Sequence, residues 1–341
     1  MQEPLPSPYD VPTDFAELQA SEQTVATLST AEYWRKICPG LHVDDERFRE
    51  SVKSAEFDLG TSEKDLLRDI CKDGYFTMSA KQCPWNVNMR EVAHGIVRLI
   101  QYGWSPTWIF MYDEVWMMAQ QVRELIKRTT GGNEMSMDFF AWYVDPKKGS
   151  RIVSAKGWGP HRDRMGSDAA SFRADKSPKL NTVWVALTDA WPENSCLYVV
   201  PAGADPKYWI GDEKTENIMN VNNPQAFQDI RAVPLLSGGL VSFSHRLIHW
   251  GNVVARTATR VTTQHEPRVA LSFVSATDDF EPPYFARSNL PFPSVKLRAS
   301  LVAAQCIAYR NQEAVPSAKG NLFFRLFQSN WESFHPGYVR K

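Results

Sequence analysis

Strand-like segments dominate residues 137–275 of this chain, and helix-like segments lie on both sides of that block. Residues 137–144 and 181–188 are rich in aromatic and β-branched side chains, as buried strands are. Residues 268–274 alternate in a way that indicates a strand with one face in a core. The block therefore predicts a β core with helices packed around it.

The flanking patterns divide one compact domain into three parts. We expect an N-terminal arm and helices over residues 1–65, a β core with a flanking helix over 66–293, and C-terminal helices over 294–341. Helix-like patterns lie at residues 31–37, 46–55, 63–72, 295–310 and 321–334, and residues 74–78 read as the first strand. Residues 1 to about 30 are rich in Pro, Ser and Thr, and we expect them to lie as an arm over the surface.

The flanking helix of the core is expected to begin at Ser105 and Pro106, because a capping side chain followed by proline favours a helix N-terminus. Its apolar residues recur at spacings of three and four as far as Ile126, and Gly131-Gly132 ends it. We interpret its stripe of Met and Trp side chains as core packing rather than as a cofactor contact.

The segment His161-Arg162-Asp163 lies between strand-like segments, and His249 follows within another. Residues two apart in an extended chain point the same way, so His161 and Asp163 can both reach one ion. Two imidazoles and one carboxylate can occupy one face of a metal and leave the opposite positions open. A non-haem Fe(II) site that binds a co-substrate and dioxygen has this arrangement. The pattern therefore predicts an enzyme with an iron site.

Two other histidines are rival ligands. His42-Val43-Asp44 is a second His-x-Asp match, but charged residues follow it, and we interpret Asp44 or Asp45 as the N-cap of a helix. His245 would share the face of His249 on a strand, but it would lie about 13 Å away along that strand. We expect His245 to have a structural role or to support the ligands, and His42 to have no metal role.

Three segments resemble the phytanoyl-CoA dioxygenase (PhyH-like) family of Fe(II)- and 2-oxoglutarate-dependent oxygenases. Residues 158–163 are similar to the first ligand segment of the family, and residues 194–204 resemble its Asn-Gly-x-Leu…Pro-Gly-Ser-His stretch. Residues 239–249, followed by 267–271, are similar to its final segment. Together the segments span roughly residues 70 to 275 in the order of the family.

The resemblance implies a mainly β fold with flanking helices, a double-stranded β-helix of the jelly-roll, cupin-like type, and the strand block fits it. It implies His161, Asp163 and His249 as catalytic iron ligands. It also implies that Arg268 binds the distal carboxylate of 2-oxoglutarate. The Asp163 carboxylate argues against the halogenating relatives, which lack it.

This chain departs from the family pattern in two places. The Gly-Ser-His of the family is Gly203-Ala204-Asp205 here, which we expect to leave iron binding intact because that His is not a family ligand. The stretch between the second His ligand and the Arg is longer than usual, with an insertion over residues 253–264. Arg256 and Arg260 within it are therefore alternative anchors for 2-oxoglutarate.

The implied activity is oxidation of a small-molecule substrate with Fe(II), 2-oxoglutarate and O2, with release of succinate and CO2. Hydroxylation, desaturation and oxidative ring closure, such as kainoid-type cyclisation in specialised metabolism, all stay open. Trp158 and Trp250 flank the ligands and are candidate walls of the substrate pocket, with core packing as the alternative. Arg173, in the loop after Asp163, is a candidate contact for an acidic substrate, with a solvated surface position as the alternative.

Two other functions compete with this one: a non-catalytic jelly-roll binding protein, and a cupin-like metalloenzyme that does not use 2-oxoglutarate. The formal net charge of −1 gives no sign of a nucleic-acid or anionic membrane partner. No apolar run is long enough to span a bilayer, and the five cysteines show no metal-type spacing. We expect an intracellular, cytoplasmic enzyme with a small-molecule substrate, and its oligomeric state stays open.

Overall fold

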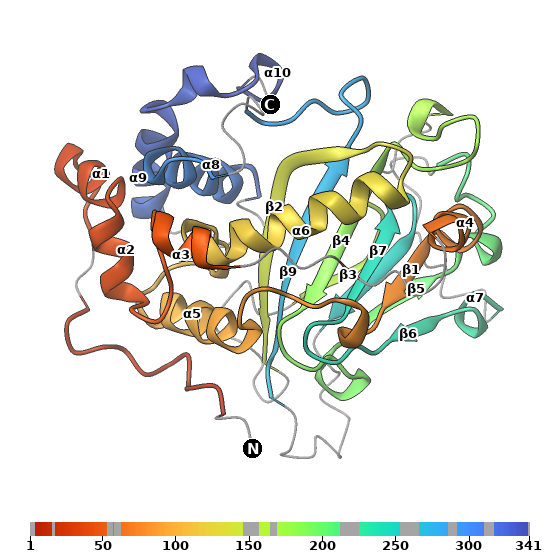
Figure 1. Cartoon of the computed structure of the whole chain (residues 1–341), viewed down its shortest axis with the longest axis horizontal. Helices are drawn as coiled ribbons and strands as arrows, with labels where there is room; N and C mark the ends of the chain where they lie inside the picture. The colour runs from red at the N-terminus through yellow and green to blue at the C-terminus, as the bar shows by residue number, and fades with distance from the viewer. Residues whose placement is uncertain are drawn as a thin grey trace.

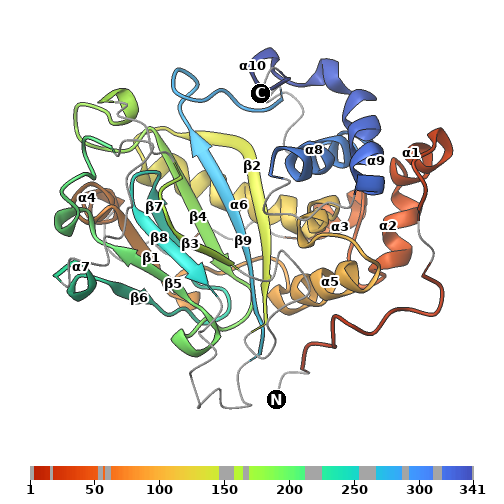
Figure 2. The ribbon, with the colours of Figure 1, turned by 180° about the vertical axis from the view of Figure 1, so that it is seen from behind.

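The computed structural model describes residues 4–15, 18–52, 57, 63–145, 157–163, 169–211, 225–252, 266–285, 292–309 and 317–339. Two antiparallel sheets form one half of the molecule, and α1, α2, α5, α8 and α9 gather in the other half (Figure 1). Helix α6 runs across the larger sheet and contacts β2 and β9. Figure 2 shows the molecule from the opposite side, with the strands of the smaller sheet in view.

The larger sheet has the strand order β1-β7-β4-β9-β2 and the smaller one β3-β8-β5-β6. The strands of the larger sheet are β1 (Tyr75–Met78), β2 (Glu134–Val144), β4 (Leu180–Ala186), β7 (Leu240–Ser244) and β9 (Arg268–Ala276). Those of the smaller sheet are β3 (Gly157–His161), β5 (Leu197–Val200), β6 (Arg231–Val233) and β8 (Ile248–Asn252). From β2 to β5 and from β6 to β9 the chain changes sheet at each successive strand. This path confirms the expected double-stranded β-helix with flanking helices.

The larger sheet is covered on both faces, and the burial of its strands follows from that position. Every residue of β4 is buried, as expected for a central strand between two apolar layers. One apolar cluster joins Trp184 and Phe243 of this sheet to Val199 of the smaller sheet. Another joins its opposite face to the helices, for example Phe139 to Phe110 with ring centroids 3.7 Å apart. The cavity described below opens between the sheets.

The helices match the expected pattern at most positions. They are α1 (Glu22–Leu28), α2 (Ala31–Ile37), α3 (Glu46–Ser51), α4 (Glu63–Asp73), α5 (Met89–Gln101), α6 (Asp113–Thr129), α7 (Gln225–Gln228), α8 (Val295–Ala308), α9 (Ser317–Gln328) and α10 (Pro336–Val339). Short 3-10 turns are η1 (Ala80–Gln82), η2 (Pro106–Met111), η4 (Ala169–Ser171), η5 (Pro192–Asn194), η6 (Ala202–Ala204) and η8 (Trp331–Ser333). Helix α1 lies within the segment expected to be an arm, and the prediction omitted α5. Within the described ranges, no helix has the length and apolar character that a membrane span requires.

The helix predicted to begin at Ser105 is divided in two. Residues of η2 end at Met111, Tyr112 is extended (φ −100°, ψ 143°), and α6 begins at Asp113. The buried Arg298 of α8 donates to the Met111 carbonyl (3.0 Å) and to Asp113 Oδ1 (2.7 Å). The Arg298 guanidinium and the Asp113 carboxylate are both out of contact with water, so each needs the other as a partner, and the guanidinium also uses the Met111 carbonyl. The free energy of these contacts outweighs the local preference for one continuous helix.

Candidate active site

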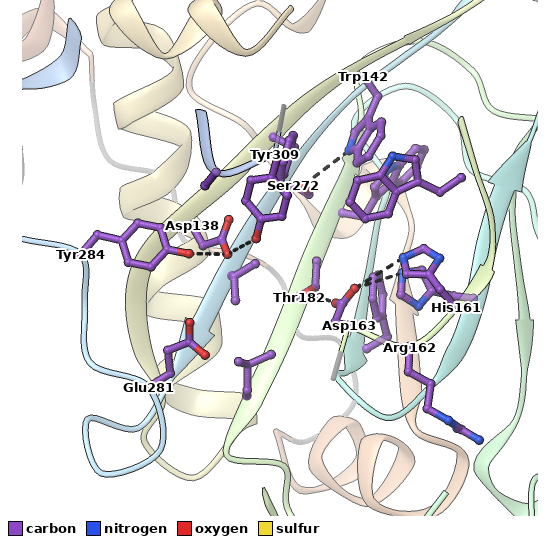
Figure 3. Close-up of a pocket in the computed structure, with 18 of the residues that line it drawn as sticks. Asp138, Trp142, His161, Arg162, Asp163, Thr182, Ser272, Glu281, Tyr284 and Tyr309 are labelled. Atoms are coloured by element: carbon purple, nitrogen blue, oxygen red, sulfur yellow. Dashed lines mark hydrogen bonds and ion pairs between the residues drawn. The ribbon is translucent and has the colours of Figure 1, made fainter. Parts of the chain in front are cut away.

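Three side chains of the predicted motif converge at one end of the smaller sheet. Figure 3 shows His161 and Asp163 pointing toward each other. His161 ends β3, and in the β3/β8 pair it lies directly opposite His249. Their ring centroids are 4.4 Å apart. Asp163 Oδ1 lies 3.7 Å from His161 Nε2 and 3.6 Å from His249 Nε2. One donor atom from each residue lies within 4.8 Å of the other two, so the three could hold one metal ion.

Hydrogen bonds fix the orientation of all three donors. The Nδ1 of His161 contacts the Gly159 carbonyl (2.8 Å), and that of His249 contacts the Leu247 carbonyl (3.0 Å). Because a carbonyl only accepts, each Nδ1 carries the proton and each Nε2 keeps its lone pair for a metal. The Thr182 hydroxyl on β4 donates to Asp163 Oδ2 (2.8 Å), which leaves Oδ1 facing the imidazoles.

The protonation state of His249 also suits metal binding. The pKa of His249 is lowered to about 4, chiefly by burial; the Asp163 carboxylate acts to raise it, and His161 acts to lower it. At neutral pH the imidazole is therefore uncharged, which is the form that binds a metal. A neutral nitrogen pair with one carboxylate oxygen fits Fe(II) and leaves the side toward the cavity open.

A cavity of about 760 Å³ extends from the three donors toward the C-terminal helices. Strands β2, β4 and β9 supply one wall, including Thr182, Trp184 and Ser272. Residues of α8, α9 and α10 line the far side: Ala304, Ile307, Ala308, Phe324, Phe327, Tyr338 and Val339. The C-terminal helices are therefore part of the site wall, and the cavity is large enough for 2-oxoglutarate together with a small substrate.

Arg268 reaches the same cavity from the start of β9. Its side chain is fully buried, and its Nε and Nη1 have no hydrogen-bond partner among the described residues. Burial lowers the pKa of Arg268 to about 10, so the guanidinium is still charged at neutral pH. A buried charge is costly without a counter-ion, and a carboxylate ligand would supply one. The alternative anchors Arg256 and Arg260 lie outside the described residues.

The two tryptophans predicted as pocket walls both line the cavity. Trp158 makes an edge contact with His161 (centroids 4.9 Å apart), and Trp250 stacks on Tyr198 (5.7 Å). The structure does not bring Arg173 to this cavity: its guanidinium donates to the carbonyls of Thr130 (2.7 Å) and Pro178 (3.0 Å). These bonds connect the loop to the body of the protein, so Arg173 is not part of our substrate proposal.

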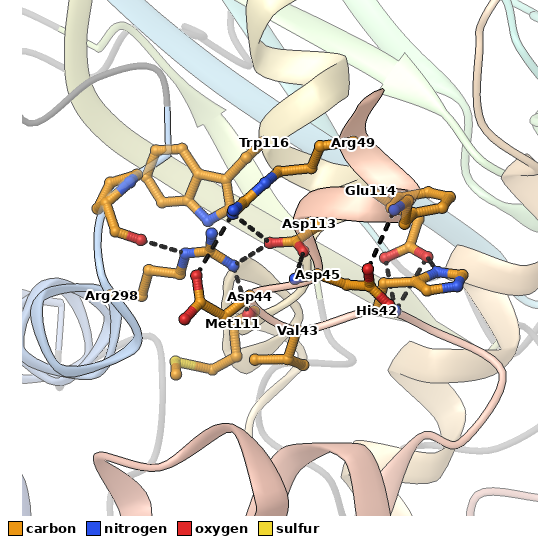
Figure 4. Close-up of polar contacts among 12 residues, drawn as sticks. His42, Val43, Asp44, Asp45, Arg49, Met111, Asp113, Glu114, Trp116 and Arg298 are labelled. Carbon is orange, nitrogen blue, oxygen red and sulfur yellow. Dashed lines mark hydrogen bonds and ion pairs between the residues drawn. The ribbon is translucent and has the colours of Figure 1, made fainter. Parts of the chain in front are cut away.

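The rival histidines lie outside the donor group. His245 Nδ1 donates to the Leu180 carbonyl (2.8 Å). His42 pairs with Glu114 (Nδ1 to Oε1, 2.6 Å) on a distant face, where it stacks on Phe48 (Figure 4). The Asp45 side chain accepts from Phe48 N (3.0 Å), which confirms that this acidic segment caps α3.

Arg162, between the two candidate ligands of the His-x-Asp motif, points away from them (Figure 3) and forms a buried ion pair with Asp205. One of its bonds, from Nη2 to Asp205 Oδ1, measures 3.1 Å, and Nη1 also donates to the Arg246 carbonyl. Asp205 stands where the family pattern has His. The pair therefore holds in place the backbone between His161 and Asp163.

Asp205→Ala is expected to lower the free energy of unfolding by about 3–5 kcal/mol, because it removes the buried carboxylate that pairs with the Arg162 guanidinium. It should also weaken iron binding, since Arg162 can then move the ligands beside it. Denaturant unfolding and iron titration measure the two effects. Asp279→Ala is the matched control, because Asp279 pairs with Lys179 at the exposed surface. Equal unfolding free energies for the two variants would rule out this role for the pair.

Several polar residues of the cavity were not predicted. Asp138 of β2 accepts hydrogen bonds from the hydroxyls of Tyr284 (2.7 Å) and Tyr309 (2.9 Å), and all three line the cavity. A signal for Asp138 was present, because it is an acidic residue within an otherwise buried aromatic strand pattern. Thr182 was within a predicted strand, but nothing local indicated that it contacts Asp163.

The phytanoyl-CoA dioxygenase (PhyH) family model matches residues 111–255, a segment that contains His161, Asp163 and His249 and ends before Arg268. No match was found among curated proteins. The match confirms the resemblance that the motifs indicated. The matched segment is thus similar to Fe(II)- and 2-oxoglutarate-dependent oxygenases of this family.

Several solved structures are similar to the chain. The non-haem α-ketoglutarate-dependent carbocyclase SnoK from nogalamycin biosynthesis is 17% identical, with 66% of this chain and 87% of that chain covered and a TM-score of 0.47. The epimerase SnoN of the same biosynthesis is 18% identical, with 63% of this chain and 82% of that chain covered and a TM-score of 0.42. AviO1 from Streptomyces viridochromogenes Tue57 is 16% identical, with 67% of this chain and 99% of that chain covered and a TM-score of 0.45. At such low identity we base no conclusion on these likenesses.

Proposed function

We propose that this enzyme oxidises a C–H bond of a small molecule bound in the cavity, with His161, Asp163 and His249 as the iron ligands and Arg268 as the anchor of 2-oxoglutarate. The observation that carries the proposal is the buried guanidinium of Arg268, whose Nε and Nη1 have no partner among the described residues and which lines the same cavity as the three donors. A cupin-like metalloenzyme that does not use 2-oxoglutarate would leave this charge uncompensated.

The protein residues supply position and a dry environment. Iron with 2-oxoglutarate and O2 supplies the oxidising chemistry, in which 2-oxoglutarate is converted to succinate and CO2. Arg268 orients the dicarboxylate through a charge-assisted, two-pronged hydrogen bond to its distal end. Trp158, in edge contact with His161, adds an aromatic wall to the cavity beside the donors. Whether the substrate is hydroxylated, desaturated or closed into a ring depends on how the cavity positions it.

The test is an anaerobic titration of the Fe(II)-loaded protein with 2-oxoglutarate, which needs no primary substrate. Direct binding of the keto acid to iron is expected to produce a visible charge-transfer band. After admission of air, iron-dependent release of succinate should follow, and metabolite fractions that contain the substrate should accelerate it. Stoichiometric iron without any band on addition of 2-oxoglutarate would instead support the alternative metalloenzyme.

A further inference from the structure

We propose that the primary substrate is a small organic cation that carries a protonated amine, and that Asp138 binds this amine at the end of the cavity opposite Arg268. The inference rests on the proposed function, because it assigns the substrate class of the same cavity. It depends on four features: the position of Asp138, its partners, the surrounding rings and the balance of charge.

The sheet register separates Asp138 from Arg268. On β9, Arg268 pairs with Val144 of β2, whereas Phe273 pairs with Phe139, the neighbour of Asp138. Arg268 and Phe273 are five positions apart on β9, which corresponds to roughly 17 Å along the strand. The cavity therefore has a cationic end, where 2-oxoglutarate is proposed to bind, and a separate end at Asp138.

The same register places Asp138 close to the metal donors. Thr182, which donates to Asp163, pairs with Val274 of β9, and Ser136 of β2 donates to the Val274 carbonyl (3.0 Å). Strand β9 lies between β2 and β4, so Asp138 lies two strand spacings, roughly 10 Å, from Thr182. A small molecule held at Asp138 can extend to the iron, so the carbon that reacts would be several bonds from the nitrogen.

Strand alternation turns the Asp138 side chain toward the cavity. Residues two apart on a strand point to the same side, so Asp138 shares a face with Phe140 and Trp142, which also line the cavity. Met137 and Phe139, on the opposite face, pack in the apolar core beneath the helices. The β2/β9 register shifts between Met135 and Phe139, and Met137 has a φ of 68°, so a β-bulge lies beside Asp138.

Asp138 has hydrogen-bond donors but no cationic partner. Tyr284, Tyr309 and the Gln305 amide (2.8 Å) donate to it, and no Lys, Arg or His among the described residues lies within ion-pair distance of it. Burial, and then the Asp138 charge, raise the pKa of both tyrosines, so their hydroxyls remain protonated donors. A carboxylate has about four acceptor positions, and three are used here. One position is left for a donor from the substrate.

Aromatic rings surround this carboxylate. Tyr338 stacks on Tyr284 with centroids 4.0 Å apart, and its buried hydroxyl has no partner within the described part of the chain. Phe140 contacts Tyr309 (4.5 Å) and Trp158 (6.0 Å), which continues the aromatic wall to His161. Ring faces attract a cation, and rings beside a carboxylate bind ammonium groups more strongly than neutral ones.

Neither arginine of the cavity lining within the described residues lies beside the Asp138 carboxylate. Glu281, a second acidic residue of the lining, lies on the same side of the cavity (Figure 3). Two arginines line the cavity within the described ranges: Arg162 is paired with Asp205, and Arg268 lies at the opposite end. An anionic group at Asp138 would meet repulsion and no counter-ion, whereas an ammonium would neutralise a buried charge.

The experiment compares three probes of one shape: benzylammonium, benzyl alcohol and benzoate. Their binding to the Fe(II)- and 2-oxoglutarate-loaded wild-type protein is measured without oxygen by calorimetry. Benzylammonium is expected to bind about tenfold more tightly than benzyl alcohol, on the order of a desolvated cation–π and charge pair. Benzoate should bind more weakly than either. Equal affinities of the amine and the alcohol, or a preference for benzoate, would overturn the proposal.

Two variants locate the preference. Asp138→Asn should remove the advantage of benzylammonium over benzyl alcohol, whereas Asp279→Asn, at the exposed surface, should keep it. Tyr338→Phe removes a hydroxyl that has no partner within the described residues, so it should fold normally. Loss of this hydroxyl as a hydrogen-bond acceptor for the ammonium should weaken benzylammonium binding about threefold. If Asp138→Asn does not fold, Tyr338→Phe and the wild-type comparison decide. A full preference in Asp138→Asn would contradict the proposal.

The result can be separated from the test of the proposed function. The charge-transfer band on addition of 2-oxoglutarate reports on iron and Arg268, and the probe comparison reports on Asp138. Both are measured on the same wild-type preparation. A band without amine preference contradicts only the substrate class, and the absence of a band contradicts the proposed function whatever the probes show.

Discussion

Replacement of His161, Asp163 or His249 with alanine is expected to abolish iron-dependent conversion of 2-oxoglutarate and to weaken iron binding by at least about 100-fold. Loss of a supporting residue around a metal typically costs roughly 10- to 100-fold, so loss of a ligand should cost at least as much. The three donor atoms lie within 4.8 Å of one another, and they form the only such group of His, Cys, Asp or Glu side chains among the described residues. Each variant therefore leaves two donors.

Iron stoichiometry and succinate release measure this prediction. His42→Ala is the matched control, because His42 belongs to the second His-x-Asp sequence but pairs with Glu114 on a distant face. It should retain iron and turnover. Wild-type iron occupancy and activity in any one of the three ligand variants would remove that residue from the proposed site.

The convergence of His161, Asp163 and His249 could be predicted because the relevant geometry is local. His161 and Asp163 are two residues apart in extended chain, and strand-like residues around His249 indicated a neighbouring strand. The direct pairing of His161 with His249 then follows from the fold that the family resemblance implied. Their supporting hydrogen bonds are local as well, to carbonyls two residues away in each case.

The substrate end of the cavity could not be predicted because its contacts are distant in sequence. Asp138 meets Tyr284 and Tyr309 across separations of 146 and 171 residues. No local pattern encodes such distant contacts. The same reason explains the division of the helix at Tyr112, which depends on an Arg298 contact 187 residues away.

Arg173 shows how loop position misleads without tertiary information. The loop follows Asp163 in sequence, so a substrate contact was a reasonable expectation. In the structure its guanidinium satisfies carbonyls at the end of α6 and within its own loop. A charged side chain in a loop often stabilises the loop itself, and only the path of the backbone distinguishes the two roles.

Arg268→Ala is expected to raise the Michaelis constant for 2-oxoglutarate by about 100-fold, the typical effect of removing one partner of a buried, hydrogen-bonded charge pair. Iron affinity should change little, since Arg268 is not among the three donors. The measurement is a 2-oxoglutarate titration of the anaerobic charge-transfer band and of turnover. If Arg268→Ala titrates like the wild type while Arg256→Ala or Arg260→Ala does not, the anchor lies in the insertion between His249 and Arg268.

Gly251→Ala tests the same anchor without removal of its charge. A Cβ at Gly251 would collide with Arg268 Nη1, whereas a Cβ at Gly203 would meet nothing within 4 Å. Because the guanidinium must move to make room, Gly251→Ala should weaken 2-oxoglutarate binding and retain iron, and Gly203→Ala should do neither. The double variant Gly251→Ala/Arg268→Ala should bind 2-oxoglutarate no more weakly than Arg268→Ala alone, because both changes act through one side chain. Additive effects would show that Gly251 and Arg268 act independently, which would exclude the proposed contact.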